Sequence, residues 1–179
     1  VKWFFDGKLN ITENIFERNK KNENDTAIIW EPNEPNDKNI ELSYSQLFEE
    51  VCSFSNVLKS LGVKKGDRVI IYLPMIPEAA ISMLACARIG AVHSVVFAGF
   101  SAKSLSDRIN DCKAKVVVTS DGNFRGNKTI PVKNVVDDAL NESSIVKSVL
   151  TIKRTNTEIQ MVDGRDHWYH ELVKKVDDF

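Results

Sequence analysis

The chain has 179 residues, of which 42% are hydrophobic, which is enough for one ordinary core. Its 24 lysines and arginines nearly balance its 25 aspartates and glutamates, giving a net charge of −1 at pH 7. This balance argues against nucleic acid or an acidic membrane surface as a partner. The longest mainly apolar stretch, 79–100, is interrupted by Arg88 and His93. It therefore indicates a buried helix followed by a buried strand, not a membrane span.

The three cysteines, Cys52, Cys86 and Cys112, are far apart and odd in number. We therefore expect no framework of paired disulfides and a reducing compartment, with the cytoplasm as the expected one and the nucleus or an organelle as alternatives. No secretory signal is visible at the start of the sequence. Because the first residue is Val1 and not a methionine, we expect the chain to be cut from a longer protein.

The chain is predicted to begin with an N-terminal arm over 1–25, in which Asn10 or Thr12 caps a short helix that runs to Arg18. An α/β subdomain is predicted over 26–179. Its strands are expected at 26–30, 68–73, 91–97, 115–119 and 146–153. Its helices are expected at 44–61, 77–89, 102–112, 136–140 and 164–176.

Local signals support several of these helix ends. Ser43 and Gln46 have the spacing of a capping box, and Ser101 is a second N-cap candidate. Gly62 and Gly90 are typical helix stops. The alternation of strands and helices predicts an α/β fold with a mostly parallel sheet and helices on both faces. Ligands of such sheets bind at the carboxyl ends of the strands.

Two segments follow predicted strands and are therefore expected at this same edge. Residues 92–101 form an apolar strand that breaks into a small-residue turn and then starts a helix. Residues 121–131 form a polar, glycine-containing loop with two cations, Arg125 and Lys128. The loop by itself is compatible with phosphate binding, although an ordinary solvated turn explains it more simply.

Other sites have weaker support. The 122–129 segment does not have P-loop spacing, and no G-x-G-x-x-G motif follows any strand. His167, His170 and Glu171 lack a further ligand cluster, so we expect packing or surface roles and no metal site. His93 is expected to be a hydrogen-bonded core residue, and Met75 and Met83 to be core fillers.

Several motifs together resemble one family, the AMP-forming acetyl-CoA synthetases, which are adenylate-forming enzymes. The resemblance covers essentially the whole chain and is carried by WF at 3–4, DGKLN at 6–10, GDRV at 66–69, YLPMIPEAA at 72–80, MLACARIGAVHSVVF at 83–97, VDDAL at 136–140 and GRD at 164–166. It implies the first subdomain of the family's large N-terminal domain. It also implies the family's reaction, in which acetate and ATP give acetyl-AMP and pyrophosphate, and coenzyme A then accepts the acetyl group.

The resemblance also implies which part of the site lies here. The family's Arg-x-Gly-Arg/Lys loop contacts the 3′-phospho-ADP part of coenzyme A, and its counterpart is Arg125, Gly126, Asn127 and Lys128, with the glycine one position early. The family's Phe-Gly-Gly-Phe turn near the adenine corresponds to Phe97, Ala98, Gly99 and Phe100, with Ala98 in place of a glycine.

The family's ATP loop, acidic Mg²⁺ ligand, acetate pocket and catalytic lysine have no match in these residues, so no catalytic residue is assigned. The chain's partners are then the substrates acetate, ATP and coenzyme A and the remainder of the same enzyme, and the segment alone is expected to be inactive. Two alternatives remain: a propionyl-CoA or other short-chain acyl-CoA synthetase, and a non-enzymatic module that binds coenzyme A or a nucleotide.

Overall fold

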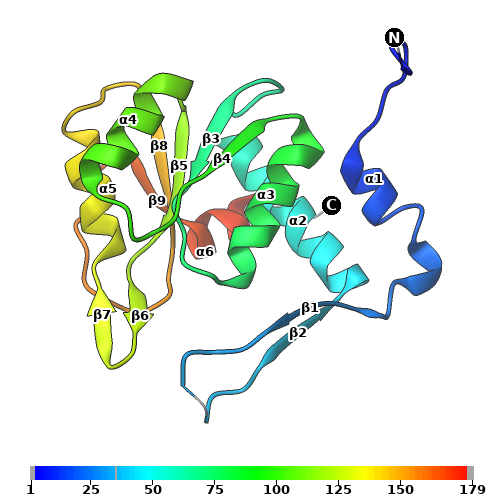
Figure 1. Cartoon of the computed structure of the whole chain (residues 1–179), viewed down its shortest axis with the longest axis horizontal. Helices are drawn as coiled ribbons and strands as arrows, with labels where there is room; N and C mark the ends of the chain where they lie inside the picture. Colours follow the sequence, from blue (N-terminus) through cyan, green and yellow to red (C-terminus); the bar gives the residue numbers. More distant parts are fainter. Residues whose placement is uncertain (1–2, 35, 177–179) are drawn as a thin grey trace.

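A five-stranded sheet lies at the centre of the molecule, and the computed structural model describes residues 3–34 and 36–176 (Figure 1). The strand order is β4-β3-β5-β8-β9. The strands are β3 (Arg68–Ile71), β4 (Val92–Val95), β5 (Val116–Ser120), β8 (Ser148–Ile152) and β9 (Asp166–Trp168). Every neighbouring pair is parallel. The predicted α/β fold with a parallel sheet is therefore confirmed.

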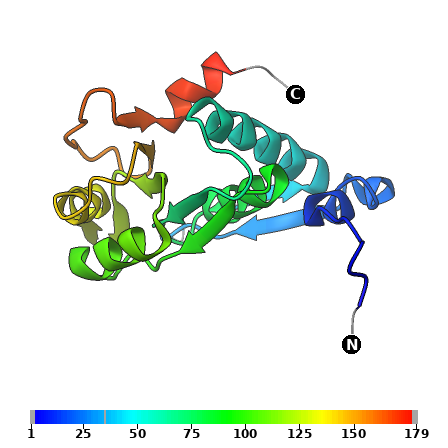
Figure 2. The same cartoon turned by 90° about the horizontal axis from the view of Figure 1, so that it is seen from above.

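Helices cover both faces of the sheet, as predicted. Figure 2 shows α2 and α6 on one side of the sheet and α4 and α5 on the other. The helices of the subdomain are α2 (Tyr44–Ser60), α3 (Pro77–Ile89), α4 (Ala102–Cys112), α5 (Val132–Leu140) and α6 (Tyr169–Leu172). Successive residues of β5 point to opposite faces, so Val116 and Val118 join one core and Val117 the other.

The predicted helix ends are confirmed at the caps. The Ser43 hydroxyl accepts from the Gln46 backbone N–H, and the Gln46 side chain accepts from the Ser43 N–H, which together form the capping box of α2. Pro77 is the first residue of α3, which ends at Gly90. The Ser101 hydroxyl accepts from the Ser104 N–H at the start of α4.

The N-terminal arm contains α1 (Ile11–Ile15) and a short 3-10 helix, η1 (Lys20–Asn22). Asn10 caps α1 as predicted, but the helix ends at Ile15 and does not reach Arg18. The arm is fastened to α3, because the Asn10 side chain donates to the Arg88 carbonyl at 2.9 Å.

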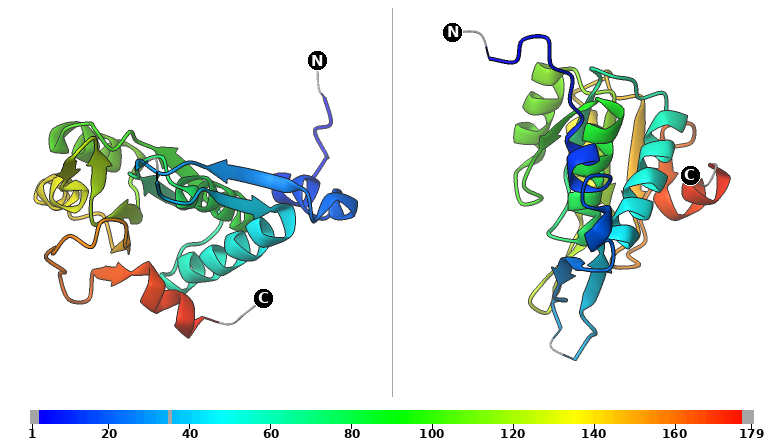
Figure 3. Two further views of the ribbon diagram at one scale, coloured as in Figure 1. Left: turned by 90° about the horizontal axis from the view of Figure 1, so that it is seen from below. Right: turned by 90° about the vertical axis from the view of Figure 1, so that its right-hand side faces the viewer.

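Two β-hairpins extend from the body of the molecule. β1 (Thr26–Trp30) has the predicted bounds and pairs antiparallel with β2 (Ile40–Ser43), which the sequence did not predict. β6 (Asn123–Arg125) and β7 (Lys128–Ile130) form the second hairpin, inside the segment predicted to be a loop. Figure 3 shows both hairpins at the same end of the molecule.

The last segment was predicted wrongly. The expected helix over 164–176 is instead β9, which pairs with β8, followed by the short α6 and a 3-10 helix, η2 (Val173–Lys175). The expected helix over 136–140 is the C-terminal part of α5, which begins at Val132. Strand β3 ends two residues before the predicted Leu73, and β4 is shorter than the predicted 91–97.

Two burial predictions were also wrong, and both concern the edge of the sheet. β4 is an edge strand of the described sheet, and it is largely exposed, with His93 on the surface and Val95 54% exposed. Met75, which follows β3, is 84% exposed, whereas Met83 is partly buried against the core. Within the described residues, no helix is long and apolar enough to cross a membrane.

Candidate functional site

A cleft of about 260 Å³ lies at the carboxyl edge of the sheet. The segments that follow β3, β4, β5 and β8 all contribute to it, as does the end of β1. Its lining residues are Trp30, Glu31, Pro32, Asn33, Pro74, Met75, Ile76, Phe97, Ala98, Asn123, Phe124 and Arg154. The expectation that the segments 92–101 and 121–131 meet at one edge is confirmed, since Phe97 and Phe124 line the same cleft.

The β6–β7 hairpin carries the two cations that the sequence singled out. Arg125 pairs directly with Lys128 across the hairpin, and Gly126 and Asn127 form the two-residue turn between them. Gly126 has φ +54°, and Asn127 is not among the residues with positive φ. A glycine at the first central position with this sign pattern is typical of a type II′ hairpin turn. The early position of the glycine therefore fits the geometry of the turn.

Arg125 and Lys128 are both exposed, and their charges have no ion-pair partner among the described residues. Within 3–34 and 36–176, no ion pair or side-chain hydrogen bond is recorded for Arg125 or Lys128. The tip of the hairpin contacts the loop after β1, because the Asn33 side chain donates to the Gly126 carbonyl at 3.4 Å. Asn123 and Phe124, at the base of the hairpin, line the cleft, whereas Arg125, Gly126, Asn127 and Lys128, at its tip, are not among the lining residues.

The turn after β4 forms the opposite wall. A hydrogen bond from the Phe100 N–H to the Phe97 carbonyl closes this turn. The Phe97 and Phe100 rings pack edge to face, with centroids 6.0 Å apart. A Cβ on Gly99 would lie 2.4 Å from the Phe97 ring, so a larger residue there would displace this exposed ring. The Tyr72 hydroxyl donates to the Phe100 carbonyl at 2.7 Å and holds the turn against the core. Burial raises the pKa of Tyr72, which keeps this donor protonated.

Sequence reasoning missed three residues of this site. Arg154 follows β8 and lines the cleft, with its guanidinium carbon 4.8 Å from the centroid of the Trp30 ring and 5.2 Å from that of Phe124. Asp121 is fully buried at the end of β5 and accepts hydrogen bonds from three backbone N–H groups. Arg154 directly follows the predicted strand 146–153, and Asp121 lies two residues after the predicted strand 115–119, so the rule that ligands bind at strand ends could have found them. The role of Trp30 had no signal in the sequence.

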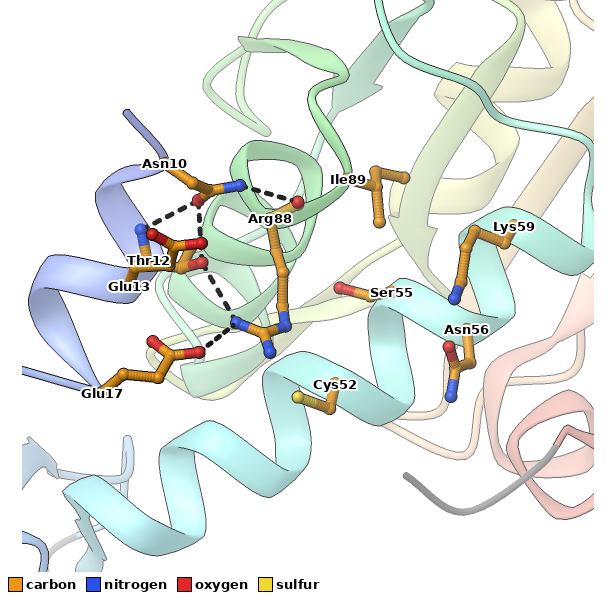
Figure 4. Close-up of a pocket in the computed structure, with 10 residues that line it drawn as sticks. All are labelled: Asn10, Thr12, Glu13, Glu17, Cys52, Ser55, Asn56, Lys59, Arg88 and Ile89. Carbon is orange, nitrogen blue, oxygen red and sulfur yellow. Dashed lines mark hydrogen bonds and ion pairs between the residues drawn. The ribbon is translucent and has the colours of Figure 1, made fainter. Parts of the chain in front are cut away.

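A second cleft, of about 410 Å³, lies between the arm and helices α2 and α3 (Figure 4). Its central cation, Arg88, is already paired, since it donates to the Thr12 hydroxyl at 3.2 Å and contacts Glu17 at 3.3 Å. Glu13 and Glu17 line the same cleft. These carboxylates and the paired arginine suit the fastening of the arm better than the binding of an anion.

The cysteines and histidines do not form a reactive centre in the described residues. Cys52, Cys86 and Cys112 are free thiols, as expected, and burial raises the pKa of Cys86 to about 12. Such a thiol stays protonated at neutral pH and is a poor nucleophile. Among residues 3–34 and 36–176, no group of three or more His, Cys, Asp or Glu side chains could hold a metal ion. The His170 ring instead packs against Trp168, with centroids 5.5 Å apart.

The sequence model of one family, described as AMP-binding enzyme, matches residues 15–177. Curated relatives include an acetyl-coenzyme A synthetase of Desulfatibacillum aliphaticivorans, which is 52% identical over 176 residues, covering 98% of this chain and 27% of that protein. Another, from Bradyrhizobium diazoefficiens, is 53% identical over 177 residues and is likewise covered over 27% of its length. The chain thus spans about a quarter of the length of these relatives.

A similar solved structure is that of the acetoacetyl-CoA synthetase from Streptomyces lividans. It superposes with a TM-score of 0.82 at 27% sequence identity, covering 94% of this chain and 25% of that chain. The likeness therefore extends over nearly the whole chain.

Proposed function

Because the chain belongs to the family of AMP-binding enzymes, we propose that it is a segment of an AMP-forming acetyl-CoA synthetase. The whole enzyme then converts acetate, ATP and coenzyme A to acetyl-CoA, AMP and pyrophosphate in the cytoplasm, through acetyl-AMP. The identity of about one half to acetyl-coenzyme A synthetases over nearly all of this chain supports this assignment. Residues 1–25 are the arm, and residues 26–179 belong to the large N-terminal domain.

The part of the reaction assigned to this segment is the binding of coenzyme A. Arg125 and Lys128 hold phosphate oxygens of its 3′-phospho-ADP part, with the Gly126–Asn127 turn between them. Phe97, Ala98 and Gly99 lie beside the adenine. The observation that carries this proposal is the pair of exposed, unpaired cations placed opposite each other at the tip of a hairpin whose base lines the same cleft as Phe97 and Ala98.

The chemistry of the two charges suits this ligand. Coenzyme A carries several phosphate charges, which a guanidinium binds bidentately and an ammonium binds as a compact charge. Both side chains are solvated when the ligand is absent, so they are available without the breaking of an internal ion pair. Each charge-assisted hydrogen bond to a phosphate is worth about 1.5–3 kcal/mol.

Acyl activation is assigned to residues outside this segment. Mg²⁺, when bound with ATP, supplies charge neutralisation at the phosphates. The described residues hold no cluster suited to a metal ion, so no step through that ion is derived for them. The segment therefore holds the carrier of the acceptor thiol, and the remainder of the enzyme forms acetyl-AMP.

The test is the double variant Arg125→Ala/Lys128→Ala in a full-length protein that contains these residues. The KM for coenzyme A is expected to rise about tenfold or more, because two phosphate contacts are lost. Acetate-dependent exchange of pyrophosphate into ATP, which reports acetyl-AMP formation alone, should be nearly unchanged.

The matched control is Arg18→Ala/Lys21→Ala. It removes one exposed arginine and one exposed lysine with the same spacing, but on the N-terminal arm. Equal losses in both half-reactions of the hairpin variant, or an effect no larger than that of the control, would contradict the assigned role.

A further inference from the structure

Arg154 is held in an unusual way at the floor of the cleft. Its guanidinium carbon lies over two aromatic rings, 4.8 Å from the centroid of Trp30 on β1 and 5.2 Å from that of Phe124 on β6. Its Nε is buried and has no hydrogen-bond partner, and no ion pair is recorded for it in the part of the chain that the structure describes. In the described residues, no hydrogen bond is recorded for the terminal guanidinium nitrogens either, so these nitrogens, and not the enclosed Nε, are available to a ligand in the cleft that Arg154 lines.

The surroundings fix Arg154 in place without neutralising it. Asp121 accepts from the Arg154 backbone N–H at 2.8 Å, from the Thr155 N–H at 3.0 Å and from the Gly122 N–H at 2.8 Å. A single buried carboxylate thus ties the loop of Arg154 to the start of the hairpin. Trp30 is fixed as well, because its indole N–H donates to the Met75 carbonyl at 2.8 Å.

We propose that Arg154 is a third phosphate-binding cation of this cleft and that Asp121 is the residue that positions it. The inference rests on the proposed function and extends it: Arg125 and Lys128 bind coenzyme A at the tip of the hairpin, and Arg154 binds a phosphate oxygen of the same molecule in the cleft. Stacking leaves the in-plane N–H groups of a guanidinium free to donate, so the aromatic contacts and the phosphate contact are compatible.

One feature of the cleft opposes an anion. Glu31 also lines it, and its carboxylate carries the same charge as a phosphate. Glu31 is exposed, however, so water and salt screen its repulsion. Arg154 is partly buried against the Trp30 ring, where its attraction for an anion is screened less.

The test compares Arg154→Gln and Arg154→Lys in a full-length protein that contains this chain. Affinity is measured by calorimetry with adenosine 3′,5′-bisphosphate and with coenzyme A, and steady-state kinetics give the KM values for coenzyme A and ATP. Arg154→Gln should weaken both ligands about tenfold, because the amide keeps much of the shape but loses the charge. The affinities of Arg154→Lys for both ligands should lie between those of the unmodified protein and those of Arg154→Gln. The KM for ATP should be unchanged.

Three outcomes would overturn the role of Arg154. It fails if Arg154→Gln lowers the melting temperature without changing either affinity, since the arginine would then serve packing alone. It also fails if the KM for ATP rises and that for coenzyme A does not. It fails finally if Arg154→Gln is silent while Arg125→Ala/Lys128→Ala weakens coenzyme A, which leaves the proposed function standing. If the hairpin variant is silent and Arg154→Gln is not, the hairpin assignment fails instead.

Discussion

The charged ammonium group of Lys133 is completely buried inside the protein. Its Nζ lies 2.8 Å from an oxygen of Asp166 and 2.7 Å from one of Asp137, and its side chain is fully buried. Arg165 pairs with both carboxylates as well. The network joins α5 to β9, which are far apart in sequence. It therefore explains how a segment that resembles a helix by sequence is held as a strand at the sheet edge.

The Asp166 carboxylate gives this network a defined pH dependence. Burial acts to raise the pKa of Asp166, but hydrogen bonds from Arg165 and Lys133 outweigh it, and the pKa lies below its usual range. A carboxyl whose folded-state pKa is depressed contributes stability that is present above its unfolded pKa of about 3.9. That contribution is lost as the pH falls through the lower, folded-state value.

We expect Asp166→Asn to lower the free energy of unfolding by about 3 kcal/mol at pH 7, because Lys133 then remains buried with one carboxylate partner fewer. The loss of stability below about pH 4 should also become shallower. Urea unfolding at a series of pH values measures both effects. Asp163→Asn, at an exposed neighbour, is the control. An unaltered acid limb in Asp166→Asn would contradict the assignment.

At the scale of elements, the sequence predicted best where a local chemical signal marks a boundary. The start of α2 was predicted because Ser43 and Gln46 satisfy each other's backbone donors, a pattern complete within four residues. Strand β1 was found because its residues favour strands and are followed by a proline-rich loop. These elements are determined by near neighbours in sequence.

The elements that were missed depend on distant partners. Strands β6, β7 and β9 have three residues each, too few for any periodicity to show. β4 was expected to be buried because it is apolar, but burial depends on what covers a strand, and a strand's residues do not encode that. Similarly, the exposed position of Met75 follows from its place between strand and helix at the open edge.

The capping box of α2 provides a test at this scale. Ser43→Ala should lower the free energy of unfolding by about 1 kcal/mol, because the Gln46 N–H loses its acceptor at the helix start. Ser53→Ala, in the interior of the same helix, should be neutral or slightly stabilising, since alanine is the better helix former. Thermal or urea unfolding of the two variants compares them directly, and equal effects would argue against the cap.

For the whole molecule, the sheet order determines which parts of the site the sequence could reveal. Phe97 and the hairpin were predicted to meet because both follow strands of a parallel sheet, and parallel strands end at one edge. The contribution of Trp30 could not be predicted, since β1 lies outside the central sheet and reaches the cleft through a separate hairpin. The rule of strand ends places Arg154 at the same edge, but its contact with Phe124 depends on β8 lying next to β5, which the sequence does not show.

The proposed division of labour predicts that the 179-residue chain does not by itself form acetyl-AMP. The family resemblance places the ATP loop and the catalytic lysine outside it, and the chain spans 27% of the length of a related acetyl-coenzyme A synthetase. Acetate- and ATP-dependent pyrophosphate release, assayed beside a full-length protein that contains the chain, should remain at the buffer background. Release clearly above that background would refute the prediction.

The cleft draws on residues from Trp30 to Arg154, so it exists only when the sheet and both hairpins are formed. A partly folded chain has no such cleft, and a ligand held there binds the native state alone. Thermodynamic linkage then makes the ligand a stabiliser of the fold: at a concentration of about 100 times its Kd, it adds about 2.7 kcal/mol to the free energy of unfolding. If coenzyme A is this ligand, its concentration in a cell would thus set how long the protein survives proteolysis as well as how fast the enzyme works.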